Sequence, residues 1–192
     1  MSDRQTQILQ AAVRVIARDG VRGLRVDKLA AEARVSTALV YYHFKDRAGI
    51  LRAALDHVNR RAQRYTDDAF AHSDDPRVRV EQLLLLELQD DDEVRENSVA
   101  WGELRASATF DTTLREPLRA TTLAWNSDVE TLIAQARDAG AVRRGIDAAV
   151  AAEHLTTLVE GLSERWHSGS ITLDRARQIL ADAIERQLGG PA

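Results

Sequence analysis

Residues 26–51 read VDKLAAEARVSTALVYYHFKDRAGIL, and the interpretation of the whole chain starts from this stretch. Its apolar spacing predicts a short amphipathic helix over about 26–33. A tight connection follows, and Ser36 at its end is a favourable N-cap for a second short helix over about 37–43. Two short helices joined in this way have the geometry of a helix-turn-helix.

The flanking sequence completes a small helical head. Apolar residues recur at helical spacing over about 5–18, which predicts an amphipathic helix, and Gly20 is placed to end it. Asp46 can cap a longer, fourth helix. We therefore predict a three-helix domain over residues 1–47 and a second, larger helical domain over residues 48–192.

The composition predicts an all-α fold. The 192 residues include three prolines, ten glycines and no cysteine, and good helix formers dominate. The second domain is expected to contain helices that begin at Asp75-Pro76 and others around 97–108, 113–139, 147–167 and 172–188, with the leucines at 83–86 buried and the acidic run at 90–93 exposed.

The same composition limits the classes of function. Without cysteine there is no disulfide, no catalytic thiolate and no Cys-based metal site. No apolar run approaches the ~18 residues of a membrane span, and the first residues lack the apolar core of a signal peptide. We therefore expect a cytoplasmic protein that has no contact with membranes.

Charge is distributed unevenly along the chain. Residues 1–60 hold eleven Lys or Arg and six Asp or Glu, whereas residues 61–192 hold fifteen Arg and twenty-four Asp or Glu. A basic head on an acidic body indicates an anionic partner for the head alone. The alternative is a chance asymmetry of a charged surface.

The helix over 37–43 is predicted to have two distinct faces. Val40 and Phe44 would face the core, while Ala38 and Tyr42 would lie opposite, flanked by Leu39 and Tyr41. An apolar leucine and two tyrosines on this outward arc suit DNA better than solvent. The alternative is that the tyrosines pack against the body. The candidate DNA-binding residues are Lys28, Ser36, Thr37, Ala38, Leu39, Tyr41, Tyr42, His43, Lys45 and Arg47.

Residues 5–55 resemble the signature of the TetR family of transcriptional regulators. The resemblance rests on the Leu29-Ala30 pair, the Val35-Ser36 turn, the Tyr-x-His-Phe run at 41–44 and the basic residue Arg47. It implies a DNA-binding head, a dimer formed through the last two helices and an effector cavity among the middle helices.

Three positions depart from the family pattern. The turn holds Arg34 where Gly is usual, which puts the turn geometry in question. Arg25 stands where a Thr often opens the second helix, so a cap is lost but a phosphate contact is gained. Arg47 replaces a common Lys and keeps its charge. Further along, the stretch HLTTLVEGLSERWHSG at 154–169 broadly resembles the BetI-type subgroup.

Apolar stripes on the last two helices fit the dimer that the resemblance implies. The alternative is ordinary intramolecular core. The candidate dimer residues are Leu155, Leu158, Leu162, Ile179, Leu180 and Ile184.

Large and polar side chains on the middle helices suit a site for a small, largely apolar effector of unknown identity. Each tryptophan among them could equally be a core residue. The candidate ligand-binding residues are Trp101, Leu104, Phe110, Trp125, Asp128 and His154.

These observations predict a ligand-responsive transcriptional regulator that binds a palindromic operator in double-stranded DNA as a homodimer, with repression as the usual mode of the family. The alternative is a TetR-like architectural or adaptor DNA-binding protein without an effector. No phosphate loop, nucleophile motif or metal-ligand spacing is present, so we expect neither an enzyme nor a cofactor or metal.

Overall fold

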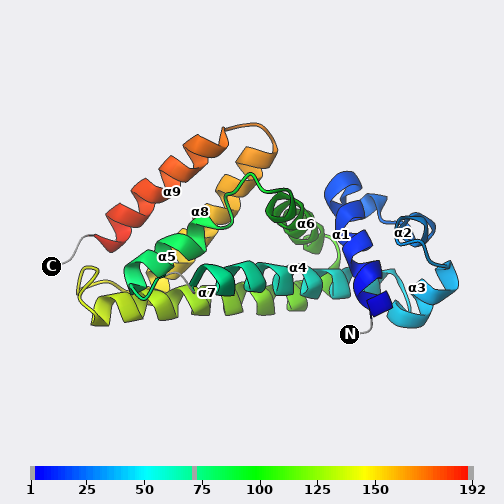
Figure 1. Ribbon diagram of the computed structural model, residues 1–192, viewed down its shortest axis with the longest axis horizontal. Helices are drawn as coiled ribbons and strands as arrows, with labels where there is room; N and C mark the ends of the chain where they lie inside the picture. The colour runs from blue at the N-terminus through cyan, green and yellow to red at the C-terminus, as the bar shows by residue number, and fades with distance from the viewer. Residues whose placement is uncertain (1–2, 71–72, 190–192) are drawn as a thin grey trace. The chain divides into compact units, whose positions relative to one another are not determined.

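The structure is a computed structural model that describes residues 3–70 and 73–189, and those residues form helices and no strand (Figure 1). The all-α prediction is therefore confirmed. The elements are α1 (Asp3–Gly23), α2 (Val26–Glu32), α3 (Thr37–Phe44), α4 (Arg47–Phe70), α5 (Pro76–Leu85), α6 (Asp92–Ala108), the 3-10 turn η1 (Thr112–Leu114), α7 (Arg115–Asp138), α8 (Ala148–His167) and α9 (Leu173–Leu188).

The chain forms two compact units. Unit 1 comprises residues 1–62 and 95–120, and unit 2 comprises residues 63–94 and 121–192. The functional boundary predicted after residue 47 stays a prediction. Within the two predicted domains, residues 1–2, 71–72 and 190–192 lie outside the described part of the chain.

Unit 1 has a continuous apolar core drawn from α1, α2, α3, the first part of α4, and α6. Ile8, Leu29, Phe44, Leu51 and Leu104 are among its buried members. The sequence placed the end of the first helix at Gly20, and the backbone does break there, with φ 73° and ψ 169°.

Unit 2 is built on the pair α8 and α9, against which α5 packs. The backbone N–H of Arg143, shortly before α8, donates to the carbonyl of Leu188 at the end of α9 (3.0 Å), so the two helices run antiparallel. Of the four leucines at 83–86, the first two are buried and the last two are half-buried, so α5 buries one side.

Helix α6 begins five residues earlier than the sequence indicated. The Asp91 carboxylate accepts the backbone N–H groups of Glu93 and Val94 at 2.9 and 3.1 Å, so the acidic run includes the residue that caps this helix. The four acidic side chains at 90–93 are exposed, as predicted.

Two further properties concern membranes and metals. None of the described helices combines the length and apolar character that crossing a bilayer requires. Within the same residues, no group of three or more His, Asp or Glu side chains is arranged to hold a metal ion.

Candidate nucleic-acid interface

The turn between α2 and α3 keeps its geometry although Arg34 stands where glycine is usual. The backbone N–H of Val35 donates to the carbonyl of Ala30 (2.9 Å), and that of Arg34 donates to the carbonyl of Ala31 (3.1 Å). This is the hydrogen-bond pattern of a Schellman motif, whose left-handed residue is Arg34 with φ 53°. Arg34 in place of the family's usual glycine therefore leaves the helix-turn-helix intact.

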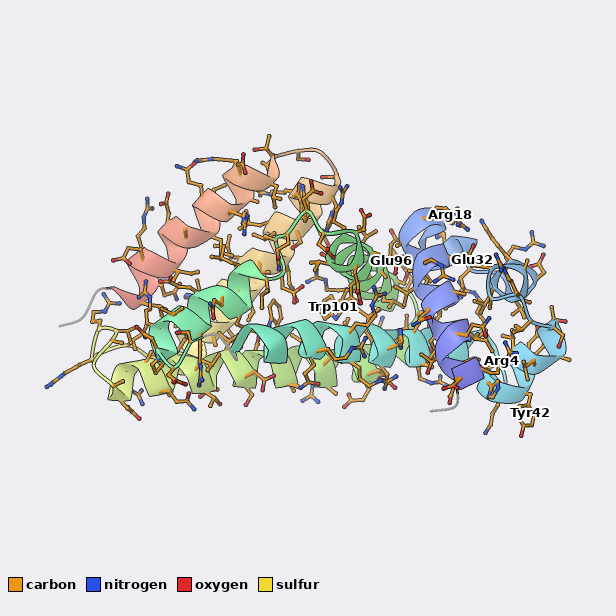
Figure 2. The ribbon with its side chains drawn as sticks, viewed as in Figure 1. Arg4, Arg18, Glu32, Tyr42, Glu96 and Trp101 are labelled. Carbon is orange, nitrogen blue, oxygen red and sulfur yellow. The ribbon has the colours of Figure 1, made fainter. Side chains whose placement is uncertain are left out.

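Helix α3 presents the two faces that the sequence predicted. Ser36 caps it, since its hydroxyl accepts the backbone N–H of Leu39 at 3.2 Å. Val40 and Phe44 are buried, whereas Tyr41 is 51% and Tyr42 is 80% exposed. Figure 2 shows Tyr42 projecting from α3 away from the rest of its unit. Large exposed aromatic side chains on a short helix form a surface suited to a partner.

The other candidates on and around α3 differ in availability. Leu39, expected on the outward arc, is instead half-buried because it packs against the core. The His43 ring is half-buried, with its centroid 5.2 Å from that of Tyr42. On α2, Lys28 pairs with Asp19 at 2.8 Å. The candidates on α3 and directly beside it that are exposed like the two tyrosines are Ser36, Thr37, Ala38 and Lys45.

Arg47 has a structural task that the sequence did not reveal. Its guanidinium donates to the backbone carbonyls of Val21 (2.5 Å) and Leu24 (3.2 Å), although the residue as a whole is exposed. It therefore fixes the connection between α1 and α2 to the start of α4. A contact between Arg47 and DNA stays a prediction.

The same connection is held by α6 through Glu103, which the sequence reasoning did not select for this head. The Glu103 carboxylate accepts the backbone N–H of Val21 at 3.1 Å. A Cβ atom at Gly20 would lie 2.9 Å from Oε2 of Glu103, so both the positive φ and the close approach favour glycine at this position. No sequence pattern marks this pairing, because 82 residues separate its partners.

Several charged side chains of the head form ion pairs with one another. The ammonium of Lys28 holds the pKa of Asp19 below its usual value, with a further contribution from Arg18. Arg14 and Arg18 lie 3.0 and 3.3 Å from Glu32 and likewise lower the pKa of that carboxyl. Because these cations are already paired, they are less available to DNA than their number suggests.

An open depression of about 640 Å³ borders the tyrosine face within unit 1. Of its lining cations, Arg22 was not selected from the sequence, whereas Arg25 was expected to add a phosphate contact. Its lining is completed by Leu24, Val26, Asp27, Thr37, Tyr41 and Arg47. Cations next to exposed hydrogen-bonding side chains are the groups that bind phosphate.

The six candidate ligand-binding residues are divided between the units. In unit 1, Leu104 is buried in the core, the indole N–H of Trp101 donates to Asn59 (2.9 Å), and Phe110 is 83% exposed. In unit 2, Trp125 is half-buried against the core, and Asp128 and His154 are exposed. Their shared role in one site stays a prediction.

The six candidate dimer residues also separate into two groups. Leu155, Leu162, Leu180 and Ile184 are buried in the core of unit 2, so they stabilise the protomer itself. Leu158 and Ile179 are half-buried and remain available to a partner surface.

A short helix-turn-helix with a capped, aromatic, outward-facing second helix defines the class of helix-turn-helix DNA-binding regulators. Two family descriptions match this chain. "Bacterial regulatory proteins, tetR family" covers residues 8–54, and "BetI-type transcriptional repressor, C-terminal" covers residues 76–189.

Individual relatives agree with these matches. The HTH-type transcriptional regulator BetI of Burkholderia mallei is 27% identical over 169 residues, which are 88% of this chain and 82% of that protein. The crystal structure of a TetR-family transcriptional regulator from Rhodococcus sp. is 46% identical, with a TM-score of 0.91 over 98% of this chain and all of that one.

A transcriptional regulator from Saccharomonospora viridis, crystallised in complex with choline, is 26% identical with a TM-score of 0.87 over 98% of each chain. The chain belongs to the TetR family of transcriptional regulators. The matched families and named relatives are regulators of transcription and not enzymes.

Proposed function

We propose that this protein is a cytoplasmic, ligand-responsive repressor that binds a palindromic operator as a homodimer. The observation that carries the proposal is the face of α3, where Tyr41 and Tyr42 are exposed beside a capped helix start at Ser36. Such a helix can enter the major groove with its N-terminal residues against base edges.

The dimer is proposed to form through α8 and α9. The half-buried Leu158 and Ile179 leave apolar surface on these helices, and Val150 at the start of α8 is 44% exposed. Two heads related by a two-fold axis would read two half-sites about 34–36 Å apart, which requires a palindromic operator.

The effector is proposed to be a small organic molecule, with choline as the first compound to test. Support comes from the choline complex of the Saccharomonospora viridis regulator and from the BetI-type match over residues 76–189. Unit 2 contributes Trp125 and the hydrogen-bonded pair Thr156–Asn126 (2.7 Å). The amide oxygen of Gln82 is also buried there and accepts no hydrogen bond from a described residue, so it offers an acceptor to a bound hydroxyl.

Control of DNA binding is proposed to be a population shift. An effector that favours a different spacing of the heads would weaken operator binding, with a coupling of about 1–3 kcal/mol in both directions. The contacts of Glu103 and Arg47 with the connection between α1 and α2 are candidates for transmitting this change to the head.

The first experiment selects duplexes from fragmented genomic DNA with the purified protein and sequences what is retained. A repressor of this kind selects a palindrome, elutes as a dimer in size-exclusion chromatography, and releases its DNA when choline or another screened compound binds. Compound binding is followed by tryptophan fluorescence.

The matched pair Leu158→Glu and Ile184→Glu then separates the interface from the core. Leu158→Glu should give a folded monomer, while Ile184→Glu, at a position 1% exposed, should unfold the protomer. A wild-type protein that stays monomeric at micromolar concentration contradicts the dimer. DNA binding that no screened compound changes favours an architectural or adaptor protein.

A further inference from the structure

Two basic residues bracket α3 in backbone conformations that side-chain-bearing residues rarely adopt. In residues 3–70 and 73–189, Arg34 and Lys45 are the non-glycine residues with a positive φ, at 53° and 65°. Arg34 lies three residues before the helix begins at Thr37, and Lys45 directly follows its last residue, Phe44. Both strained positions therefore flank one eight-residue helix.

The strain at each position has a defined origin. Arg34 is the left-handed residue of the Schellman motif that ends α2, a position that helices usually fill with glycine. Lys45, with ψ −56°, is the centre of a γ-turn, because the backbone N–H of Asp46 donates to the carbonyl of Phe44 at 2.7 Å. A γ-turn with positive φ is rare and strained. Glycine would adopt both conformations without this steric cost.

The side chains of Arg34 and Lys45 are exposed, and no described residue pairs with either of them. Neither side chain forms a hydrogen bond or ion pair with another described residue. Lys28 and Arg14, by contrast, are paired with Asp19 and Glu32. Both turns require a positive φ that glycine would adopt without steric cost, and at both positions the residue that bears this cost is an exposed cation, which indicates a functional constraint.

The positions of the two cations relative to α3 suit contacts with the DNA backbone. Arg34 precedes the helix and Lys45 follows it, so an exposed cation lies beyond each end of the helix that is proposed to enter the major groove. We propose that Arg34 and Lys45 form a clamp that binds backbone phosphates on either side of the major groove that α3 enters. This proposal rests on the proposed operator binding, and it adds Arg34 to the residues that hold the operator.

The clamp predicts that stability and affinity change in opposite directions. Arg34→Gly and Lys45→Gly relieve the strain, so each should raise Tm by about 2–4 °C. Each also removes a cation that binds phosphate, so affinity should fall by about tenfold. The slope of log K against log salt should become shallower by about 0.9 for each phosphate that a bound head no longer neutralises.

The experiment measures Tm and salt-dependent binding on a duplex that the wild-type protein selects from a random-sequence pool. Arg34→Lys retains the cation and should keep the wild-type slope. Arg34→Asn is a second uncharged variant that tolerates a left-handed backbone, and it should behave like the glycine variant. Arg144→Gly removes an exposed cation of unit 2 and should leave the slope unchanged.

Higher Tm with lower affinity and a shallower slope in the glycine variants supports the clamp. Wild-type binding together with an unchanged slope in both glycine variants overturns the clamp alone. A wild-type protein that selects no duplex overturns operator binding itself, and the clamp fails with it.

Discussion

Helices α3 and α6 both carry large aromatic side chains in unit 1, but they use them differently. On α3, Tyr42 is 80% exposed. On α6, the Trp101 indole donates to Asn59 of α4 (2.9 Å), and the guanidinium of Arg105 lies 4.8 Å from the centre of its ring. The availability of an aromatic residue is therefore decided by partners on neighbouring helices as well as by its position on its own helix.

The contacts between α4 and α6 explain why Trp101 is held. Arg61 of α4 lies 2.8 Å from Glu96 of α6, and the amide of Asn97 donates to the carbonyl of Val58 (3.1 Å). Together with the bond between Trp101 and Asn59, these interactions form a polar seam along the two helices. We expect Trp101 to contribute to stability and Tyr42 to binding.

The largest effect is expected from truncation of the α6 aromatic. Trp101→Ala should lower the free energy of unfolding by about 2–3 kcal/mol, because it removes a half-buried ring together with its hydrogen bond. Trp101→Phe keeps most of the packing and should lower the same free energy by about 1 kcal/mol. Urea denaturation measures both. Unchanged stability together with an abolished effector response would instead place Trp101 in the ligand site.

An intermediate effect is expected at Arg47, which stabilises the fold as Trp101 does and is also predicted to contact DNA as Tyr42 is. Arg47→Ala should cost about 1–2 kcal/mol of stability, because the carbonyls of Val21 and Leu24 lose the hydrogen bonds that the guanidinium donates. Arg47→Lys keeps the charge but not the forked geometry, so it should restore only part of that stability. Thermal melts measure the change. A variant that melts like the wild type but no longer binds DNA would show that Arg47 acts on DNA alone.

Several features of the fold and site could be predicted because they depend on local sequence. The caps at Ser36 and Asp75, the break at Gly20 and the two faces of α3 follow from residue spacing. The confirmed TetR membership likewise came from a contiguous stretch.

Long-range contacts could not be predicted. The pairing of Glu103 with Val21 joins residues 82 positions apart, and the bond from Trp101 to Asn59 joins residues 42 apart. Whether Leu155 faces the core or a partner also depends on how helices pack, which an apolar stripe does not specify. Spacing reveals the faces of a helix, but it does not reveal what covers each face.

The smallest effect concerns pH and the paired charges of the head. The pKa values of Asp19 and Glu32 are lowered by Lys28 and by Arg14, respectively, so both carboxylates stabilise the folded state in their charged form. That stabilisation is complete above the unfolded values of about 4 and disappears as the pH falls through the lower, folded values. Tm should therefore decline below about pH 4. The decline should be smaller in the double variant Asp19→Asn, Glu32→Gln, and an identical decline would show that these pairs do not contribute.

The central claim, that the outward face of α3 binds DNA, is tested most directly at Tyr42. The measurement compares Tyr42→Ala with the wild type in thermal unfolding and in binding to the duplex that the wild type selects. Because the side chain is 80% exposed, Tm should stay within about 2 °C. Affinity for the duplex should fall about tenfold or more, because alanine can provide neither the hydroxyl nor the aromatic surface that meets DNA. A variant that melts and binds like the wild type would contradict the claim.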